Sequence, residues 1–374
     1  MNRLLTAFIA ATAVLASGMS LAEAREMRVG PAAPPAHPAN SHLYQKLVEY
    51  LPEESGGALT ARIFGPEVVR LPQIKDALQS QVIEIGNLLP LYFPAELPNM
   101  AMAGELALSG REPHVMGAAV TEFIVTCPAC IEEMKGLGVV YLGSGSSGTY
   151  HVLSTKPINT AEDLKGLRLR SGGAPFSRWA EHFGAVPVSL PVGDTFESIS
   201  QGTIDGSIAS LGDLLSYRLV ELVKSINMVV VGTYHATSNF TVAEQTWGSL
   251  SVDERKALAR AANRANADFT QRWGYEIGKE AEAAANEAGI EFVAPDAGLT
   301  EAAEAYAQED QTVAAELSKD RFNMDDADQR VARFLELVEK WTAIVEETGP
   351  DANAIAAKVQ EEVWDKVDFS TYGL

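Results

Sequence analysis

Residues 157–213 read PINTAEDLKGLRLRSGGAPFSRWAEHFGAVPVSLPVGDTFESISQGTIDGSIASLGD. Short runs rich in apolar and β-branched residues alternate here with segments of helical period. In chain order the pattern predicts strand 167–170, helix 175–183, strand 186–190, helix 195–201 and strand 204–208. Strands that are separated by crossover helices pair in parallel, because each helix returns the chain to the same end of the sheet. This stretch therefore predicts an α/β domain with a parallel sheet.

An arginine ends the first of these strands. Arg168 and Arg170 fall on the same face of the strand, and Arg170 is followed by Ser171-Gly172-Gly173. A guanidinium binds a planar carboxylate through two parallel hydrogen bonds. The carboxyl ends of strands in an α/β sheet open onto the ligand crevice. Arg170 is therefore a candidate ligand for a carboxylate, and the alternative is a surface arginine paired with a neighbouring acid.

The flanking sequence continues the α/β pattern toward the N-terminus and becomes mainly helical toward the C-terminus. Further strands are predicted over 26–32, 59–64, 82–88, 139–142, 149–155, 227–231, 239–243 and 290–294. Ser251 to Glu254 has the sequence of a capping box and begins a long helix. No clean linker separates the two halves, which favours two domains joined by several crossing segments.

The chain is acidic and begins with an export signal. Its 374 residues include 29 Lys+Arg and 50 Asp+Glu, for a formal net charge of −21. A surface of this charge repels phosphate backbones and excludes nucleic-acid binding. Residues 1–24 start with Arg3, continue as an apolar run and end in Ala22-Glu23-Ala24, a small-x-small cleavage pattern. We expect cleavage near Ala24 and a soluble protein in the periplasm.

A glycine-rich segment matches a nucleotide-binding motif in letters only. Residues 143–148 read GSGSSG and follow a predicted strand. A dinucleotide site requires these glycines to open a helix, but the residues at 149–155 favour a strand. We interpret 143–148 as a flexible crossing between domains.

The two cysteines form a C-x-x-C motif at Cys127 and Cys130, within or at the end of a helical stretch over 112–136. In an oxidising compartment this spacing predicts a local disulfide. The alternative is an exported redox enzyme that uses both thiols. The histidines and serines show no spacing typical of a metal site or a catalytic triad, so we predict no metal, no cofactor and no enzymatic activity.

Several segments occur in an order that is typical of one family. They are 53–57 (EESGG), 77–84 (ALQSQVIE), 157–170 (PI…DLKGLRLR), 184–188 (GAVPV), 202–206 (GTIDG) and 247–251 (W…LS). In this series the chain resembles the solute receptors of TRAP (tripartite ATP-independent periplasmic) transporters, the DctP-type family. An ABC-type solute-binding protein, which shares the two-domain logic, is the alternative.

The resemblance implies a two-domain α/β periplasmic-binding-protein fold, with a cleft between the domains and a long bracing helix. It also implies that Arg170 clamps the carboxylate of a small organic acid, which the protein delivers to membrane permease subunits. We expect a monomer. The expected parts are a signal peptide over 1–24, domain I from 25–148 plus about 239–277, domain II from 149–238 plus about 278–345, and a helical tail over about 346–374 that packs on the domains.

Departures from the family pattern indicate a less polar ligand. Many relatives carry a second arginine where this chain has Tyr150, and the usual Asn-Pro after the G-x-x-D-G segment is Ala209-Ser210 here. The strand that often supplies a glutamate reads NLLP at 87–90. We predict a monocarboxylate with an apolar, aromatic or hydroxylated body. Its predicted contacts are Arg170, Tyr150, Phe93, Phe176, Ser210, Asn87, Tyr234 and His37.

Overall fold

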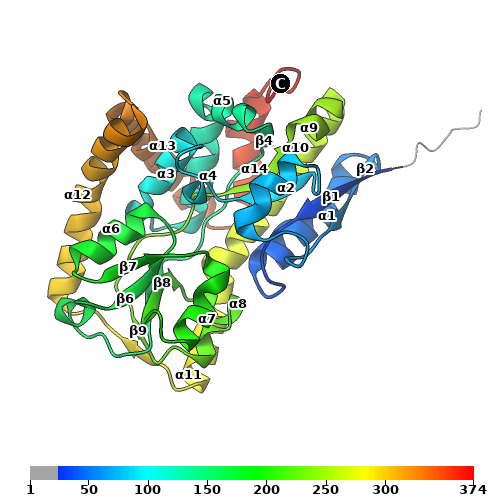
Figure 1. Cartoon of the computed structure of the whole chain (residues 1–374). Helices are drawn as coiled ribbons and strands as arrows, with labels where there is room; N and C mark the ends of the chain where they lie inside the picture. Colours follow the sequence, from blue (N-terminus) through cyan, green and yellow to red (C-terminus); the bar gives the residue numbers. More distant parts are fainter. Residues whose placement is uncertain (1–23) are drawn as a thin grey trace, which may run out of the picture.

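The computed structural model describes residues 24–374 and shows two α/β domains, each built on one mixed β-sheet (Figure 1). The predicted signal peptide lies outside the described residues except for Ala24, where the described part begins. The two-domain α/β fold predicted from the sequence is confirmed.

The first sheet has five strands in the order β2-β1-β3-β10-β4. Their bounds are β1 Arg25–Gly30, β2 Leu59–Ile63, β3 Ile85–Leu88, β4 Val139–Tyr141 and β10 Ser238–Ala243. The β1 strand runs parallel to β2 and β3, whereas β10 runs antiparallel to β3 and β4. Because β10 comes from a distant part of the sequence, the chain must return to this sheet after it has formed β5 to β9 of the second one.

The second sheet has six strands in the order β11-β9-β5-β8-β6-β7. Their bounds are β5 Tyr150–Ser154, β6 Arg168–Ser171, β7 Val186–Ser189, β8 Gly206–Ser210, β9 Ser225–Asn227 and β11 Glu291–Val293. The β6 strand is parallel to both β7 and β8, as the alternation in 157–213 predicts. The strand expected over 227–231 ends at Asn227, although Val231 and Gly232 still exchange backbone hydrogen bonds with Tyr150 of β5 before the chain continues to β10 in the other sheet.

Helices cover both sheets and dominate the C-terminal third of the chain (Figure 1). Those before β9 are α1 Gln45–Glu54, α2 Ile74–Gln79, α3 Pro98–Glu105, α4 Pro113–Val125, α5 Pro128–Gly136, α6 Ala174–His182, α7 Thr195–Ser200 and α8 Asp213–Ser216. Those after β10 are α9 Glu244–Ser249, α10 Val252–Gln271, α11 Ile277–Glu287, α12 Ala297–Phe322, α13 Ala327–Thr348 and α14 Ala352–Glu362. Within residues 24–374 no single helix has the length and apolar composition of a membrane span, and α4 and α5 meet this description only as a pair bent by 79°.

One long helix braces the two domains. Ser251 caps α10, and its hydroxyl and the Glu254 carboxylate form the predicted capping box. A π-helical turn at Arg272–Glu276 joins α10 to α11, so the helical path continues to Glu287. The α10 segment packs on α1 and α14, whereas α11 packs on α8 beside the second sheet.

The glycine-rich crossing at 143–148 is held more firmly than the sequence suggests. It joins β4 to β5, and its backbone N–H groups donate hydrogen bonds to the hydroxyls of Thr121, Thr237 and Thr270. Most of the segment is buried. Thr121 belongs to α4 and Thr270 to α10. Thr237 belongs to residues 228–237, which connect β9 to β10 and are called the second crossing below. The glycine-rich segment is therefore not a free flexible linker.

A buried ion triad links helices that cover different sheets. Arg178 on α6 contacts Glu105 at the end of α3 and Asp310 on α12, both at 2.6 Å. All three side chains are nearly excluded from water. Since α6 packs on β6 and β7, the triad anchors the second domain to α3 and α12.

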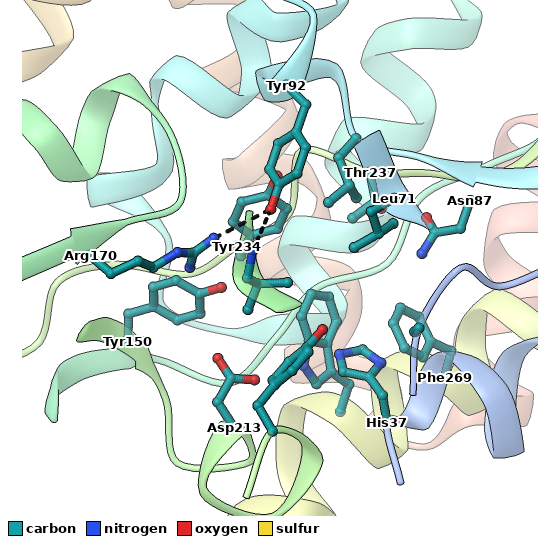
Figure 2. A pocket seen from close by; sticks show the side chains of 15 residues that line it. His37, Leu71, Asn87, Tyr92, Tyr150, Arg170, Asp213, Tyr234, Thr237 and Phe269 are labelled. Atoms are coloured by element: carbon teal, nitrogen blue, oxygen red, sulfur yellow. Dashed lines mark hydrogen bonds between the residues drawn. The ribbon is translucent and has the colours of Figure 1, made fainter. Parts of the chain in front are cut away.

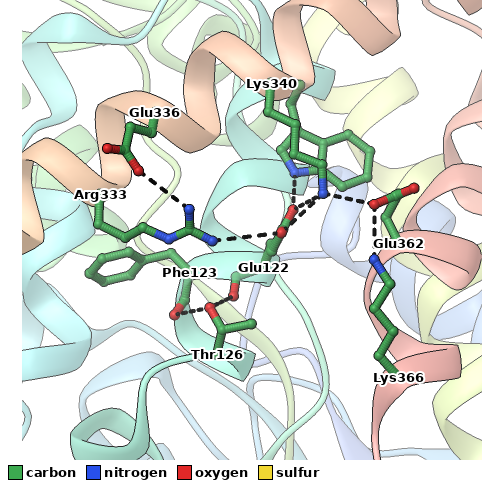
Figure 3. Close-up of polar contacts among 9 residues, drawn as sticks. Glu122, Phe123, Thr126, Arg333, Glu336, Lys340, Glu362 and Lys366 are labelled. Atoms are coloured by element: carbon green, nitrogen blue, oxygen red, sulfur yellow. Dashed lines mark hydrogen bonds and ion pairs between the residues drawn. The ribbon is translucent and has the colours of Figure 1, made fainter.

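The last helices pack mainly on the first domain. Phe334 and Trp341 on α13 are fully buried, and Phe334 meets Phe123 of α4 edge to face at 5.6 Å. Glu122 of α4 accepts hydrogen bonds from Lys340 and from the Trp341 indole at 2.8 Å, and Lys340 also contacts Glu362 of α14 (Figure 3). The apolar stripe of α13 faces α4. The assignment of 327–345 to the second domain stays a prediction.

Candidate functional site

A cavity of about 40 Å³ lies between the two sheets and is lined by both domains and by the bracing helix (Figure 2). The first domain supplies Asn87 at the end of β3 and Tyr92 in the turn that follows. The second supplies Tyr150, Arg170 and Asp213, which lie at the start of β5, near the end of β6 and just beyond β8. Strand ends of both sheets therefore meet at this cavity, as expected for a ligand crevice in α/β sheets.

Arg170 is buried in this cavity with only 2% of its surface exposed. Its Nε donates a hydrogen bond to the carbonyl of Leu190 at 3.2 Å, and Nη2 donates to the Tyr92 hydroxyl at 3.3 Å. Neither partner is charged. In the part of the chain that the structure describes, no carboxylate forms an ion pair with this guanidinium.

Arg168, unlike Arg170, is a surface arginine paired with a neighbouring acid. It lies two residues earlier on the same strand, remains partly exposed, and contacts both carboxylate oxygens of Asp205 at 2.9 and 3.2 Å. These contacts hold the pKa of the Asp205 carboxyl well below its usual range. Thus the exposed arginine is paired with an acid, whereas the buried one faces the cavity without a charged partner.

Tyr92 connects the two domains at this point. Its hydroxyl accepts hydrogen bonds from Arg170 and from the backbone N–H of Val192, at 3.3 and 3.1 Å. Both donors belong to the second domain, and Tyr92 ends a short 3₁₀ turn of the first. Any anion that binds Arg170 from the cavity side competes with this hydroxyl for the guanidinium.

Asp213 is the one acidic group that lines the cavity among the described residues. Its side chain is 3% exposed, and Figure 2 shows its carboxylate directed into the cavity. Burial raises the pKa of Asp213 from 3.8 to about 7, and the positive charge of Arg170 only partly offsets this effect.

Aromatic rings form most of the remaining lining. Tyr150 stacks on Phe176 with the ring centres 4.9 Å apart, and Phe176 stacks on Tyr234 at 6.3 Å. On the other side His37 lies among Tyr217, Phe269 and Trp273. Burial lowers the pKa of His37 to about 4 and keeps the pKa of the three tyrosines at 150, 217 and 234 well above 10, so these rings are uncharged at neutral pH.

Three buried polar atoms of the lining have no hydrogen-bond partner within residues 24–374. They are Oδ1 of Asn87, the hydroxyl of Tyr234 and the indole Nε1 of Trp273. Buried polar atoms are normally paired, because leaving one unpaired costs about 1–3 kcal/mol. All three atoms are therefore candidates for contacts with a polar group of a bound molecule.

The structure brings together five of the eight contacts predicted from the sequence. Arg170, Tyr150, Asn87, Tyr234 and His37 line the cavity. Phe176 lies one layer behind, between two tyrosines. Ser210, the last residue of β8, is buried but is not among the residues that line the cavity.

Phe93 points to a different surface. It follows Tyr92 at the end of the 3₁₀ turn, its ring lies 5.4 Å from the ammonium of Lys75, and it lines a separate hollow with Pro94. Adjacent residues in such a turn point in different directions, so the inward position belongs to Tyr92.

Ten lining residues were not predicted from the sequence, and six of them have polar or aromatic side chains: Tyr92, Asp213, Tyr217, Thr237, Phe269 and Trp273. Asp213 carries the same signal that identifies Arg170, because it follows the carboxyl end of a predicted strand. Phe269 and Trp273 are four residues apart near the end of a helix and share one face. Nothing local distinguishes the other three from core residues.

The C-x-x-C motif forms a disulfide between Cys127 and Cys130, whose Cα atoms are 5.3 Å apart. Cys127 caps α5, so the motif does lie at a helix N-terminus, but it follows helix α4 and not a strand. Neither cysteine lines the cavity.

Comparison with known proteins agrees with this architecture. Bacterial extracellular solute-binding protein, family 7 (DctP), matches residues 29–316. A solute-binding protein of Roseobacter denitrificans is 31% identical over 119 residues, which are 31% of this chain and 35% of that protein. The curated relatives are matched over less than half of their own length.

Solved structures share the fold at low sequence identity. A TRAP solute-binding protein from Rhodoferax ferrireducens, in complex with copurified benzoate, is 20% identical with a TM-score of 0.76, over 86% of this chain and 99% of that one. A marine-metagenome TRAP protein specific for aromatic acids, in complex with 3-hydroxybenzoate, is 21% identical with a TM-score of 0.76, over 85% and 99% of the two chains. Since the family match covers most of the described residues and the fold agrees with it, this chain belongs to the DctP family of solute-binding proteins, whose members are receptors and not enzymes.

Proposed function

We propose that this protein is a periplasmic receptor that binds an organic acid and delivers it to the permease subunits of a TRAP-type transporter. The single observation that carries the proposal is Arg170, a buried guanidinium in an interdomain cavity that lacks a carboxylate partner among the described residues. A buried charge without a counterion is costly, so the site favours a ligand that supplies a negative charge.

The ligand is a monocarboxylate with an apolar, aromatic or hydroxylated body. One arginine lines the cavity in the described chain, which matches one carboxylate. The rings of Tyr217, Phe269 and Trp273 provide apolar faces for the body, and Tyr150 supplies a neutral hydroxyl. Two of the similar structures contain benzoate and 3-hydroxybenzoate, which are ligands of this class.

The same proposal includes export and assembly. The predicted signal peptide directs the protein to the periplasm, with cleavage near Ala24. There it acts as a monomer that alternates between an open and a closed arrangement of the two domains. In the closed arrangement the Arg170–carboxylate pair is shielded from water, which strengthens it.

Arg170→Lys tests this proposal, with Arg168→Lys as the matched control on the same strand. We expect Arg170→Lys to weaken binding of aromatic monocarboxylates by roughly 30-fold or more, because lysine cannot form the bidentate contact and a desolvated charge pair contributes about 2–5 kcal/mol. Arg168→Lys should leave affinity unchanged. Isothermal titration calorimetry measures both, and thermal unfolding without added ligand should show little change because Arg170 makes only two neutral hydrogen bonds.

Two results would contradict the proposal. One is equal affinity of wild type and Arg170→Lys for every acid that binds. The other is a thermal-shift screen in which only dicarboxylates or sugar acids stabilise the wild-type protein.

A further inference from the structure

Asp213 is a charged group at the cavity that the binding of a carboxylate does not explain. Its carboxylate enters the cavity from the start of α8, while the guanidinium of Arg170 enters from β6 (Figure 2). Among the described residues, no basic side chain forms an ion pair with Asp213, and the backbone of Ser210 is the hydrogen-bond donor near it. Burial of 97% of a carboxylate side chain without a charged partner lowers the stability of the fold. A role of Asp213 in ligand binding would account for this cost.

The charged and titratable groups around Asp213 limit the kind of ligand group that it can bind. The ionisable groups that face Asp213 are Arg170 on β6, Tyr150 on β5, Tyr217 after α8, Tyr92 after β3, Tyr234 on the second crossing and His37 before α1. The rings of Tyr150, Tyr217, Tyr234 and His37 are uncharged at neutral pH, so the cavity can carry charge only on Arg170 and on Asp213 when it is ionised, and no ion pair joins these two groups. A bound carboxylate adds a second negative charge to this low-dielectric space, and that charge must be offset by a hydrogen-bond donor or a proton at Asp213.

We propose that Asp213 is a second ligand contact, which accepts a hydrogen bond from a hydroxyl group on the ligand while Arg170 holds the carboxylate. The inference rests on the proposed function and narrows it to hydroxylated monocarboxylates, in which the hydroxyl and the carboxylate lie at different ends of an aromatic body. A hydroxyl offers one proton to one acceptor, which matches the single carboxylate present. An ammonium group has three N–H donors and needs more acceptors than the aromatic walls around Asp213 provide.

Matched pairs of acids test the inference. Calorimetry compares benzoate with 3- and 4-hydroxybenzoate, phenylacetate with its 3- and 4-hydroxy derivatives, and includes 3-(aminomethyl)benzoate as a cationic analogue. We expect one hydroxylated acid to bind wild type at least tenfold more tightly than its parent, the same acid without the hydroxyl. The parent acid binds more weakly because it leaves the buried carboxylate of Asp213 without a hydrogen-bond donor. The cationic analogue should bind more weakly than that hydroxylated acid.

The variants Asp213→Ala and Asp213→Asn separate a ligand contact from a structural role. In Asp213→Ala the hydroxylated acid should lose its advantage, whereas the parent acid should gain affinity because a negative neighbour has been removed. Glu197→Gln is the control, since it removes one exposed carboxylate of the same domain and should preserve the wild-type ratio. Both Asp213 variants should fold, because they remove a buried charge, and their melting temperatures verify this.

Each outcome has one meaning. A tenfold preference in wild type that disappears in Asp213→Ala supports the inference. Equal binding of parent and hydroxylated acids to wild type, an unchanged preference in Asp213→Ala, or tightest binding of the cationic analogue would overturn it and leave the receptor function intact. If no aromatic acid binds wild type at all, the proposed ligand class fails together with the inference.

Discussion

Asp213→Asn should change how the stability of the protein depends on pH. The pKa of this carboxyl rises from 3.8 to about 7 because folding buries it. Between these values the unfolded chain is ionised while the folded protein keeps the proton, so wild type binds more protons when folded and its free energy of unfolding falls as pH rises. Asparagine has the same shape without the titration, so the variant lacks this loss.

The size of the effect follows from the two pKa values. Each pH unit between them corresponds to about 1.36 kcal/mol, so wild type should lose up to about 4 kcal/mol relative to Asp213→Asn between pH 4 and pH 8. The loss should be complete above pH 7. Hydration of the carboxylate when the domains open reduces the figure, which makes it an upper limit.

Urea denaturation at pH 4, 5, 6, 7 and 8, followed by tryptophan fluorescence without added ligand, measures this difference. All other titrating groups are common to both proteins and cancel. Glu197→Gln serves again as the control and should show no slope against wild type, because its carboxylate is exposed. A difference between wild type and Asp213→Asn that stays constant with pH, or that favours wild type as pH rises, would refute the assignment of Asp213 as a buried group with a raised pKa.

Two further predictions concern the scaffold. Arg178→Met should lower the free energy of unfolding by about 3–5 kcal/mol in urea denaturation, because it leaves the buried carboxylates of Glu105 and Asp310 without their cation; a loss below 1 kcal/mol would show that the triad is dispensable. Replacing Cys127 and Cys130 together by serine should cost about 2 kcal/mol, the loop-closure entropy of so short a loop, and leave ligand affinity unchanged; a variant that folds normally but no longer binds its acid would contradict the structural role of the disulfide.

The architecture could be predicted because it rests on local signals. The alternation of strands and helices over 157–213 predicts β6, β7 and β8 with α6 and α7 between them, and the structure contains these elements in that order. The capping box at Ser251 marks the start of the bracing helix for a similar reason, since two side chains three residues apart satisfy the backbone there. The packing of α13 could not be predicted in this way, because an apolar stripe shows that a helix is buried but not on which domain.

The residues of the binding site also fall into some that local sequence signals predict and others that they do not. Residues at strand ends, such as Arg170, could be identified because sheet topology directs the carboxyl ends of strands to the crevice. The choice between Tyr92 and Phe93 could not be made, since both are aromatic and only the turn geometry turns one inward.

The order of residues alone thus determines an acidic chain, an α/β fold and an arginine at a strand end, because periodicity, charge and capping act over a few neighbouring residues. The three-dimensional fold is needed to show that, within residues 24–374, Arg170 forms no ion pair while Arg168 is paired with Asp205, and that Asp213 faces the same cavity as Arg170. These facts depend on groups that are far apart in the chain and become neighbours only when two sheets and one helix pack around a common space.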